Sequence, residues 1–344
     1  MLAVYKSGPV PGIDIVDRPE PDLASDDMVR VEVGTCGICG TDLDIYHWGP
    51  VAARLITVPL ILGHEVAGTV VEAGRAVTQF KVGDRVVLDT SGRCGRCYYC
   101  RLGRFNHCLE QQNKLGQQID GGLTRYVLAP EITLNRIPEG MPFEEASVIQ
   151  PMTTAMHCIE RVDITPGDDV AIIGPGPIGQ LAAMLAERAG AHRVIVLGMA
   201  IDEPRLHMAR DRGYDVVVSD RDDPAEAVRA LTGGWGVEVA IDASGGAETL
   251  TLAIDLIRMG GHVGIIGHSP PGMSDASHAL TKEATIYTTW RRLPVTWDHA
   301  INLAATRKVD LRSLITHRLP VSRVREAFDA LERRECMKAI IMPE

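Results

Sequence analysis

Residues Val170–Gly179 read VAIIGPGPIG, an apolar run followed directly by a glycine-rich turn. The turn has the spacing Gly-x-Gly-x2-Gly, and the helical pattern Ile178–Ala189 begins inside it. Glycines at these positions permit a tight turn, a close approach of the backbone to a pyrophosphate, and close packing of helix against strand. The free N–H groups at the start of the helix would face the anion. The stretch therefore predicts a dinucleotide-binding α/β fold.

Strands and helices alternate along the chain after this turn. Gly190 is expected to end the first helix, and the pattern Glu203–Arg212 predicts a second one. Short apolar runs predict further strands at 194–197, 216–218, 237–241 and 262–266. Strands that alternate with helices indicate a doubly wound parallel sheet.

The region before residue 150 has a different pattern. Runs rich in valine and isoleucine, such as 28–33, 66–72 and 85–88, are separated by Gly/Asp turns, which is typical of a β-rich domain. After about residue 287 the pattern is mixed, with helices predicted at 297–306 and 324–333 and a closing strand at 338–342. A chain of 344 residues is long for a single core, so two domains are expected.

Composition excludes several classes of partner. Hydrophobic residues make up 45% and charged residues 23%, which is an ordinary globular balance. The net charge of −10 argues against a nucleic-acid partner, because a phosphate backbone is bound by basic surfaces. No apolar run reaches the roughly 18 residues that a membrane helix needs, and the N-terminal sequence lacks a signal-peptide pattern. We therefore expect a cytoplasmic protein without a membrane partner.

Residues 94–108 read CGRCYYCRLGRFNHC and contain four closely spaced cysteines. Short Cys-x2-Cys turns let one loop present several thiolates to a tetrahedral zinc ion, and four sulfurs leave no open position. Cys94, Cys97, Cys100 and Cys108 therefore predict a structural zinc site. The alternatives are four unrelated thiols or a nucleic-acid-binding zinc ribbon, which usually has two separated knuckles.

A second candidate metal site combines two stretches. Residues 34–48 read GTCGICGTDLDIYHW and residues 63–68 read GHEVAG, so Cys39, His64 and Glu65 can supply sulfur, nitrogen and oxygen ligands. A catalytic zinc needs about three protein ligands and one exchangeable position, where it polarises an alcohol oxygen. The alternative is a buried cysteine, a hydrogen-bonded core histidine and a surface carboxylate. Cys36 is interpreted as a core residue.

The cofactor's phosphate state is left open by the sequence. The strand after the glycine-rich turn normally ends in an acid that binds the adenosine ribose of NAD. Here residues 194–197 are followed by Gly198, and the first acid is Asp202. Arg205 could neutralise a 2′-phosphate, whereas Asp202 on an extended loop could reach the ribose; NAD is slightly favoured over NADP.

In this order, the motifs resemble those of the zinc-containing medium-chain alcohol dehydrogenase superfamily. The resemblance includes the GHExxG box, the four-cysteine lobe, the GxGxxG turn and the ending LITHRLPVSRVREAFDAL. The stretch GICGTDLDIYHW looks closest to the threonine 3-dehydrogenase and sorbitol (polyol) dehydrogenase branches.

The resemblance implies a GroES-like β-rich catalytic domain and a Rossmann NAD(P)-binding domain, with the active site in the cleft between them. The first part of the catalytic domain is expected at 1–149, with a structural zinc lobe at 92–110. The Rossmann domain is expected at 150–286, and at 287–344 the chain returns to complete the catalytic domain. It also implies a homodimer or homotetramer with two zinc ions per chain. Cys39, His64 and Glu65 match the catalytic zinc ligands, and Thr41 matches the hydroxyl that takes the substrate proton. The cofactor-binding residues would be Gly174, Pro175, Gly176, Pro177, Ile178, Gly179, Thr154, Gly245, Ile266 and Gly267, with Asp202 or Arg205.

Two positions depart from the family pattern. Asp44 stands where a histidine usually relays the proton to solvent. We expect Asp44 or His47 to serve as the relay in this chain. The alternative is that Asp44 caps a helix and water carries the proton. Gln150 stands where these branches usually place an acid, and it is a possible neutral zinc ligand.

With these motifs, the resemblance implies a zinc-dependent enzyme that transfers a hydride between a secondary alcohol and NAD(P). A sugar, cyclitol or polyol is favoured as the substrate, and L-threonine-like oxidation is the alternative. Trp48, Trp290, His47 and Arg291 are candidates for the substrate pocket, with plain packing or surface exposure as the alternative. Two rival interpretations are a non-catalytic nucleotide-binding protein and a zinc-independent reductase of the same fold.

Overall fold

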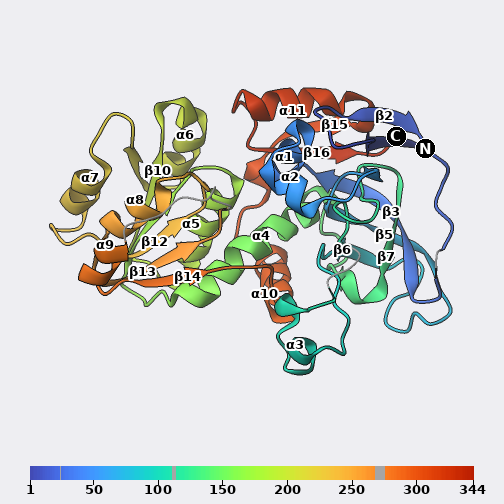
Figure 1. Ribbon diagram of the computed structural model, residues 1–344, viewed down its shortest axis with the longest axis horizontal. Helices are drawn as coiled ribbons and strands as arrows, with labels where there is room; N and C mark the ends of the chain where they lie inside the picture. The colour runs from blue at the N-terminus through green and yellow to red at the C-terminus, as the bar shows by residue number, and fades with distance from the viewer. Residues whose placement is uncertain (24, 111–113, 268–275) are drawn as a thin grey trace. The chain divides into compact units, whose positions relative to one another are not determined.

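The computed structural model describes residues 1–23, 25–110, 114–267 and 276–344. They form two compact units, one made of Met1–Gln150 with Leu293–Glu344 and the other of Pro151–Arg292 (Figure 1). The first boundary falls inside helix α4 (Phe143–Val162). We call these the split unit and the inserted unit.

The inserted unit contains a fully parallel six-stranded sheet in the order β11-β10-β9-β12-β13-β14. Its strands are β9 (Asp169–Ile173), β10 (Arg193–Gly198), β11 (Asp215–Val218), β12 (Val237–Asp242), β13 (Ile257–Ile265) and β14 (Thr285–Thr288). The strand order reverses direction next to β9, which is the doubly wound arrangement of dinucleotide-binding domains. The predicted parallel sheet is confirmed.

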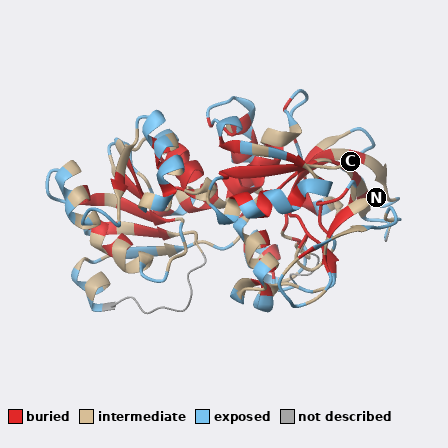
Figure 2. Ribbon diagram, turned by 90° about the horizontal axis from the view of Figure 1, so that it is seen from above, coloured by how far each residue is buried: buried red, intermediate tan, exposed pale blue. Residues whose placement is uncertain are grey.

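Helices connect these strands and cover their apolar side chains. They are α5 (Pro177–Ala189), α6 (Glu203–Asp211), α7 (Pro224–Leu231), α8 (Thr249–Leu256) and α9 (Ala276–Thr281). Helix α5 begins with a proline at its first position and ends at Gly190, whose φ of 106° only glycine adopts easily. Figure 2 shows buried residues along the central strands, and the core includes Ala171, Ile195 and Ala240.

The split unit is built mainly from antiparallel strands. One sheet has the order β15-β16-β3-β5-β6-β8, with β7 also paired to β3, and a smaller sheet has the order β2-β1-β4. The strands are β1 (Leu2–Lys6), β2 (Asp14–Asp17), β3 (Met28–Gly37), β4 (Leu60–Ile61), β5 (Glu65–Ala73), β6 (Arg85–Leu88), β7 (Tyr126–Pro130), β8 (Leu134–Arg136), β15 (Ile315–Pro320) and β16 (Lys338–Met342).

The split unit also contains short helices. They are α1 (Gly40–His47), α2 (Pro50–Leu55), α3 (Tyr98–Arg101), α10 (Pro294–Ala305) and α11 (Val324–Glu332). Single 3-10 turns in the chain are η1 (Phe105–His107), η2 (Glu131–Thr133), η3 (Ala200–Asp202), η4 (Arg312–Leu314) and η5 (Val321–Arg323).

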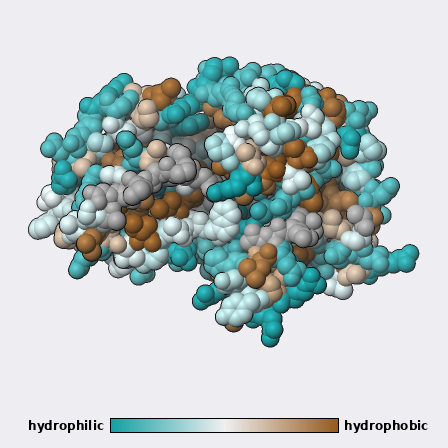
Figure 3. All heavy atoms as spheres, in the orientation of Figure 1, coloured by the Kyte–Doolittle hydropathy of each residue, from teal (hydrophilic) through white to brown (hydrophobic). Residues whose placement is uncertain are grey.

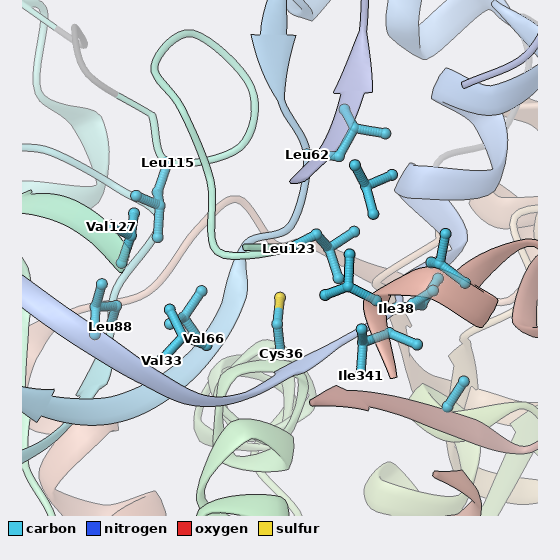
Figure 4. Close-up of a cluster of buried hydrophobic side chains, with 14 of the residues drawn as sticks. Val33, Cys36, Ile38, Leu62, Val66, Leu88, Leu115, Leu123, Val127 and Ile341 are labelled. Carbon is cyan, nitrogen blue, oxygen red and sulfur yellow. The ribbon is translucent and has the colours of Figure 1, made fainter. Parts of the chain in front are cut away.

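The last strand returns to the N-terminal half of the chain. β16 pairs antiparallel with β3, where Ile341 lies opposite Cys36. Figure 4 shows Cys36 with its sulfur pointing toward Leu123 among apolar side chains. Cys36 is fully buried, and this burial raises the pKa of its thiol well above the ordinary value. Cys36 is therefore a core residue, as the sequence indicated.

Some elements differ from the sequence-based expectations. β13 begins at Ile257, five residues before the predicted start, because the chain passes directly from α8 into the strand. The 20-residue helix α4 was not predicted, since its internal Pro151 resembles a helix-breaking signal. The predicted helices at 203–212 and 324–333 match α6 and α11 to within one residue.

The surface is mostly polar. Figure 3 shows hydrophilic side chains over most of the face drawn, with hydrophobic residues in small patches. Among the described residues no helix is long and apolar enough to cross a bilayer.

Gly63 provides a test of how the split unit is packed. Its φ is 99°, and a Cβ there would lie 2.7 Å from the backbone nitrogen of Leu123 and 2.8 Å from the sulfur of Cys36. Gly12 has a φ of 102° but nothing within 4 Å of the same position. Both alanine variants carry the backbone strain of ~1–2 kcal/mol. We expect Gly63→Ala to lose a further ~1–3 kcal/mol from overpacking.

Thermal unfolding of Gly63→Ala and Gly12→Ala under identical conditions measures this difference. Equal shifts of the unfolding temperature in the two variants would contradict the crowding at Gly63.

Candidate functional site

The four cysteines of residues 94–108 converge on one point. Their ligand atoms all lie within 4.8 Å of one another. Cys94 Sγ is 3.6 Å from Cys108 Sγ and 4.0 Å from Cys100 Sγ. Four sulfurs bound at ~2.3 Å to one tetrahedral zinc lie ~3.8 Å apart. The spacing of the thiols therefore fits a zinc ion with no additional ligand.

Backbone N–H groups in this loop favour the thiolate form. The N–H of Cys97 points to Cys94 Sγ at 3.3 Å, and the N–H of Cys94 points to Cys108 Sγ at the same distance. Hydrogen bonds from the backbone of Leu109 and Cys100 lower the pKa of Cys97 to about 6. Burial and the neighbouring thiols raise the pKa of Cys100 to about 12, so in the metal-free loop the negative sulfur is favoured at Cys97, the form in which cysteine binds zinc.

The second cluster consists of Cys39, His64 and Glu65, whose ligand atoms also lie within 4.8 Å of one another. Cys39 is the N-cap residue of α1, directly after β3, and Glu65 opens the neighbouring strand β5. Strand pairing places Glu65 opposite Gly37. Cys39 is half-buried, whereas His64 and Glu65 are buried. One half-buried ligand and two buried ones suit a site that is accessible from the side of Cys39.

Glycines make room for this cluster. A Cβ on Gly37 would overlap the carboxylate of Glu65, and a Cβ on Gly68 would overlap the backbone carbonyl of Glu32 on β3. Gly68 of the GHExxG box therefore lets β3 and β5 approach closely, and Gly37 on β3 leaves a space for the Glu65 side chain.

Asp42 orients the cluster, and its role was not predicted from the sequence. It is fully buried; its Oδ2 accepts a hydrogen bond of 2.9 Å from the Cys39 N–H, and its Oδ1 lies 3.6 Å from His64 Nδ1. Burial acts to lower the pKa of His64, but Asp42 and Cys39 outweigh it and raise that pKa well above the ordinary value. A carboxylate at one ring nitrogen leaves the other nitrogen to face a metal. The sequence signal was its place three residues after the N-cap.

Lys338 is the second residue that the sequence did not reveal. It opens β16, is almost fully buried, and donates hydrogen bonds to Glu65 Oε1 at 2.8 Å, Glu65 Oε2 at 2.7 Å and the carbonyl of Ile38 at 3.0 Å. Burial opposes its charge, but Glu65 outweighs this effect and raises the pKa of Lys338. All three of its donors are satisfied.

The charges of these buried groups test whether a metal fits. If Cys39 binds a metal as a thiolate and His64 binds it as the neutral base, Cys39, Asp42 and Glu65 carry three negative charges. Lys338 carries one positive charge, which would leave a net charge of minus two around the metal position. Buried charges are costly unless they are balanced. A divalent cation would neutralise this net negative charge, and the sulfur, nitrogen and oxygen donors match the ligand preferences of zinc. The residues therefore fit a zinc ion.

The proposed proton-relay residues occupy different surroundings. Thr41 Oγ1 lies 3.7 Å from Cys39 Sγ, beside the cluster. Asp44 Oδ2 accepts a 2.6 Å hydrogen bond from the N–H of Ala52, so it caps helix α2. His47 Nε2 lies 2.5 Å from Glu332 Oε1 in an exposed ion pair. Gln150 is buried in α4.

The glycine-rich turn of the inserted unit has the expected geometry. Gly174 has a φ of 100°, and a Cβ there would lie 2.9 Å from the Cβ of Ser244. A Cβ on Gly179 would overlap the carbonyl oxygen of Gly174, whereas Gly176 has nothing within 4 Å. Gly176 is also the N-cap of α5. The backbone is therefore open to a ligand at the middle glycine and closed at the other two, which fits a pyrophosphate.

The loops after β12 and β13 are organised by Asp242, a third residue missed from the sequence. Its buried Oδ1 accepts hydrogen bonds from Ser244 Oγ at 2.7 Å and from Gly245 N–H at 3.2 Å. Its backbone carbonyl accepts the N–H groups of Ile266 and Gly267. The predicted cofactor residues Gly245, Ile266 and Gly267 are thus brought together, at the carboxyl ends of adjacent strands.

The turn after β10 differs from the extended loop expected there. Residues 200–202 form the 3-10 turn η3, and Asp202 is only 5% exposed. Its Oδ2 accepts a 3.2 Å hydrogen bond from the Met199 N–H, and its Oδ1 lies 3.8 Å from Arg205 Nη1. Asp202 therefore turns inward.

The remaining candidates lie in separate units. Trp48 ends α1 with a left-handed backbone and packs against the core of the split unit. Trp290 and Arg291 belong to the inserted unit, where Arg291 lies over the Trp290 ring at 5.8 Å. Thr154 is half-buried in the part of α4 that belongs to the same unit.

Two sequence families match the chain. The alcohol dehydrogenase GroES-like domain matches residues 25–139, and the zinc-binding dehydrogenase family matches residues 177–306. The first match covers strands of the split unit and both cysteine clusters, and the second begins at the first residue of α5.

Individual proteins match along nearly the whole chain. A sorbitol dehydrogenase of Halalkalibacterium halodurans is 34% identical over 96% of this chain and 95% of its own length. An L-threonine 3-dehydrogenase of Symbiobacterium thermophilum is 34% identical over 100% of this chain and 98% of its own. The crystal structure of a zinc-binding dehydrogenase from Sinorhizobium meliloti bound to NADP is 30% identical, with a TM-score of 0.91 over 99% of both chains.

Family, fold and site point in the same direction. The two matched families correspond to a GroES-like β-rich part and a Rossmann-type part, and the structure contains both kinds of fold. The chain therefore belongs to the zinc-containing medium-chain alcohol dehydrogenase superfamily, and it is an oxidoreductase that acts on alcohols with a nicotinamide cofactor.

Proposed function

We propose that this dehydrogenase oxidises the secondary alcohol of a polyol, cyclitol or sugar with NAD, using a catalytic zinc held by Cys39, His64 and Glu65. The observation that carries the proposal is that the sulfur, nitrogen and oxygen ligand atoms of these three residues lie within 4.8 Å of one another, beside the buried Asp42 and the Lys338–Glu65 ion pair. We further propose a second, structural zinc at Cys94, Cys97, Cys100 and Cys108.

Each residue has a defined task in this proposal. A zinc ion bound at the cluster supplies Lewis acidity toward an alcohol oxygen. Thr41 accepts the alcohol proton, since its hydroxyl lies beside Cys39. Lys338 holds both carboxylate oxygens of Glu65, and Asp42 orients His64. The turn Gly174–Gly179 would hold the pyrophosphate of the cofactor, and a nicotinamide cofactor would supply the hydride acceptor for the substrate carbon.

The proton path beyond Thr41 is proposed to run through the cofactor ribose and water. Asp44 and His47 were the alternative relays, but Asp44 caps α2 and His47 pairs with Glu332. Gln150 is proposed as a neutral neighbour of the zinc, because it is buried and lies in the split unit with the three ligands.

Substrate choice rests on two kinds of support. The sorbitol dehydrogenase relative acts on a polyol by name, and the L-threonine 3-dehydrogenase relative is equally similar. A neutral glutamine in place of an acid leaves the site with less negative charge, which favours a neutral hydroxyl-rich substrate over an amino alcohol that carries an ammonium group.

Assembly and compartment follow from two further features. β14 is the last strand of the parallel sheet, and among the described residues its outer edge has no partner. An open edge can pair with the same edge of a second copy, so we propose a homodimer or homotetramer, which light scattering can measure. All eight cysteines are free thiols, which suits the reducing cytoplasm.

Zinc content tests the two metal sites. We expect about two zinc ions per chain in the wild type and about one in both Cys39→Ser and Cys97→Ser, because each variant removes a ligand from one cluster. Elemental analysis of the purified proteins measures this. Cys36→Ala is the control, since Cys36 lies three residues from Cys39 but in the core, and it should retain both ions. Loss of zinc from Cys36→Ala alone would contradict the assigned ligands.

Replacement of Lys338 tests the charge balance. Lys338→Met leaves the Glu65 carboxylate buried without its partner, an effect that typically costs ~3–5 kcal/mol. We expect the metal-free variant to unfold at a clearly lower temperature than the metal-free wild type, and added zinc to recover more stability in the variant. Lys338→Arg keeps the charge and should stay near the wild type.

Thermal unfolding before and after zinc is restored to the chelated proteins measures both effects. Identical unfolding temperatures for metal-free Lys338→Met and wild type would contradict the role of the ion pair.

An alcohol panel tests the proposed substrate class. The panel contains polyols, cyclitols, aldoses and L-threonine, each assayed with NAD and with NADP by absorbance of the reduced cofactor. We expect turnover of at least one polyol, cyclitol or sugar with NAD, and loss of that turnover in Cys39→Ser. Turnover of L-threonine alone would replace the polyol proposal with the threonine alternative.

A further inference from the structure

The strand that normally supplies the acid for the adenosine ribose has no space for one. β10 ends at Gly198, and a Cβ there would lie 2.7 Å from Pro175 Cγ and 2.9 Å from Leu206 Cδ2. Pro175 belongs to the glycine-rich turn, so the close packing of that turn excludes any side chain at the strand end. Asp202, the next acid along the chain, is buried and bonded to the Met199 backbone.

An acid from the neighbouring strand occupies this edge instead. Asp220 follows β11 and is exposed, and its Oδ1 accepts a 2.7 Å hydrogen bond from the N–H of Ala200. The residue before it, Ser219, donates its N–H and its hydroxyl to the carbonyl of Gly198, at 2.8 and 3.1 Å. These bonds hold Asp220 against the turn that follows β10. Among the described residues its second oxygen, Oδ2, has no partner.

A dinucleotide bound to this sheet passes this position. The pyrophosphate lies at the N-terminus of α5, and the adenosine half extends over the carboxyl ends of the strands beside β9. β10 is the first of these strands and β11 the second. Gly176, with nothing within 4 Å of its Cβ position, marks where the ligand enters. An exposed carboxylate at the ends of β10 and β11 would therefore face the adenosine ribose of a dinucleotide bound in this way.

We propose that Asp220 is the cofactor-selecting residue, whose carboxylate accepts hydrogen bonds from the ribose hydroxyls of NAD and repels the 2′-phosphate of NADP. The inference rests on the proposed use of NAD and names the residue that would determine it. It differs from the ordinary arrangement because the acid comes from the end of β11 and not from the end of β10.

The charges around Asp220 support exclusion of a phosphate. Arg205 is paired with Asp202, and Arg210 donates to Glu203 at 2.6 Å, so both arginines are already opposed by acids. Arg221 is the remaining nearby cation, and it interacts with Glu203 as well. Asp220 and the exposed Asp222 on either side of Arg221 keep this edge negative.

The test compares binding of NADH and NADPH to the zinc-loaded protein by titration of the nicotinamide fluorescence. The wild type is expected to bind NADH at least tenfold more tightly than NADPH. In Asp220→Asn, the amide oxygen can still accept the bond from Ala200, but the charge is lost. We expect NADH binding to weaken roughly tenfold, because hydrogen bonds to a charged acceptor are stronger than neutral ones. NADPH binding should become tighter.

A matched control separates a local contact from a general change of charge. Asp222→Asn removes the same charge two residues away and should leave the NADH/NADPH ratio within about twofold of the wild type. Equal weakening of both cofactors in Asp220→Asn would show a purely structural cap and overturn the inference. Preference of the wild type for NADPH, or loss of that preference in Arg221→Gln, would overturn it too. A protein that binds neither cofactor would instead contradict the proposed nicotinamide chemistry itself.

Discussion

The buried ion pair between Lys338 and Glu65 is the interaction on which the catalytic unit depends. A lysine in an apolar interior is stable only when all its donors and its charge are satisfied. Glu65 and the carbonyl of Ile38 satisfy them, and they bind the first residue of the last strand to residues 273 and 300 positions earlier in the chain. The same pair sets the charge that remains for a metal. The same ion pair therefore attaches the last strand to the split unit and sets the charge beside the proposed metal ligands.

The nucleotide site is shaped by what the backbone excludes. Gly174 and Gly179 are closed to any side chain, Gly198 is closed by the turn itself, and only Gly176 is open. Asp242 then draws the loops after β12 and β13 together through one carboxylate and one carbonyl. Hydrogen-bonded loops over a rigid parallel sheet give the cofactor a preformed surface, and little ordering is needed when it binds.

The motifs with short spacing were predictable because their geometry is local. The cysteine loop folds around its own four sulfurs, and the glycine-rich turn joins one strand to the helix that follows. The cluster of Cys39 with His64 and Glu65 was foreseen as a possible ligand set and through family resemblance, and the pairing of β3 with β5 brings it together. Helix α4 was missed because its internal proline imitates a boundary, although burial on most sides keeps the helix intact.

The sequence by itself determined the parallel nucleotide-binding sheet and the four-cysteine loop, because the residues of each signal lie in one short stretch of chain, and the resemblance of its motifs indicated the superfamily. Only the tertiary structure decided which acids and cations surround the sites. Asp42, Lys338 and Asp242 are ordinary charged residues in the sequence, and Asp202 was considered there as part of an extended loop. Burial and long-range strand pairing set the environment of each of these side chains. They determine which charges are desolvated, which are neutralised by partners, and which remain accessible to a ligand.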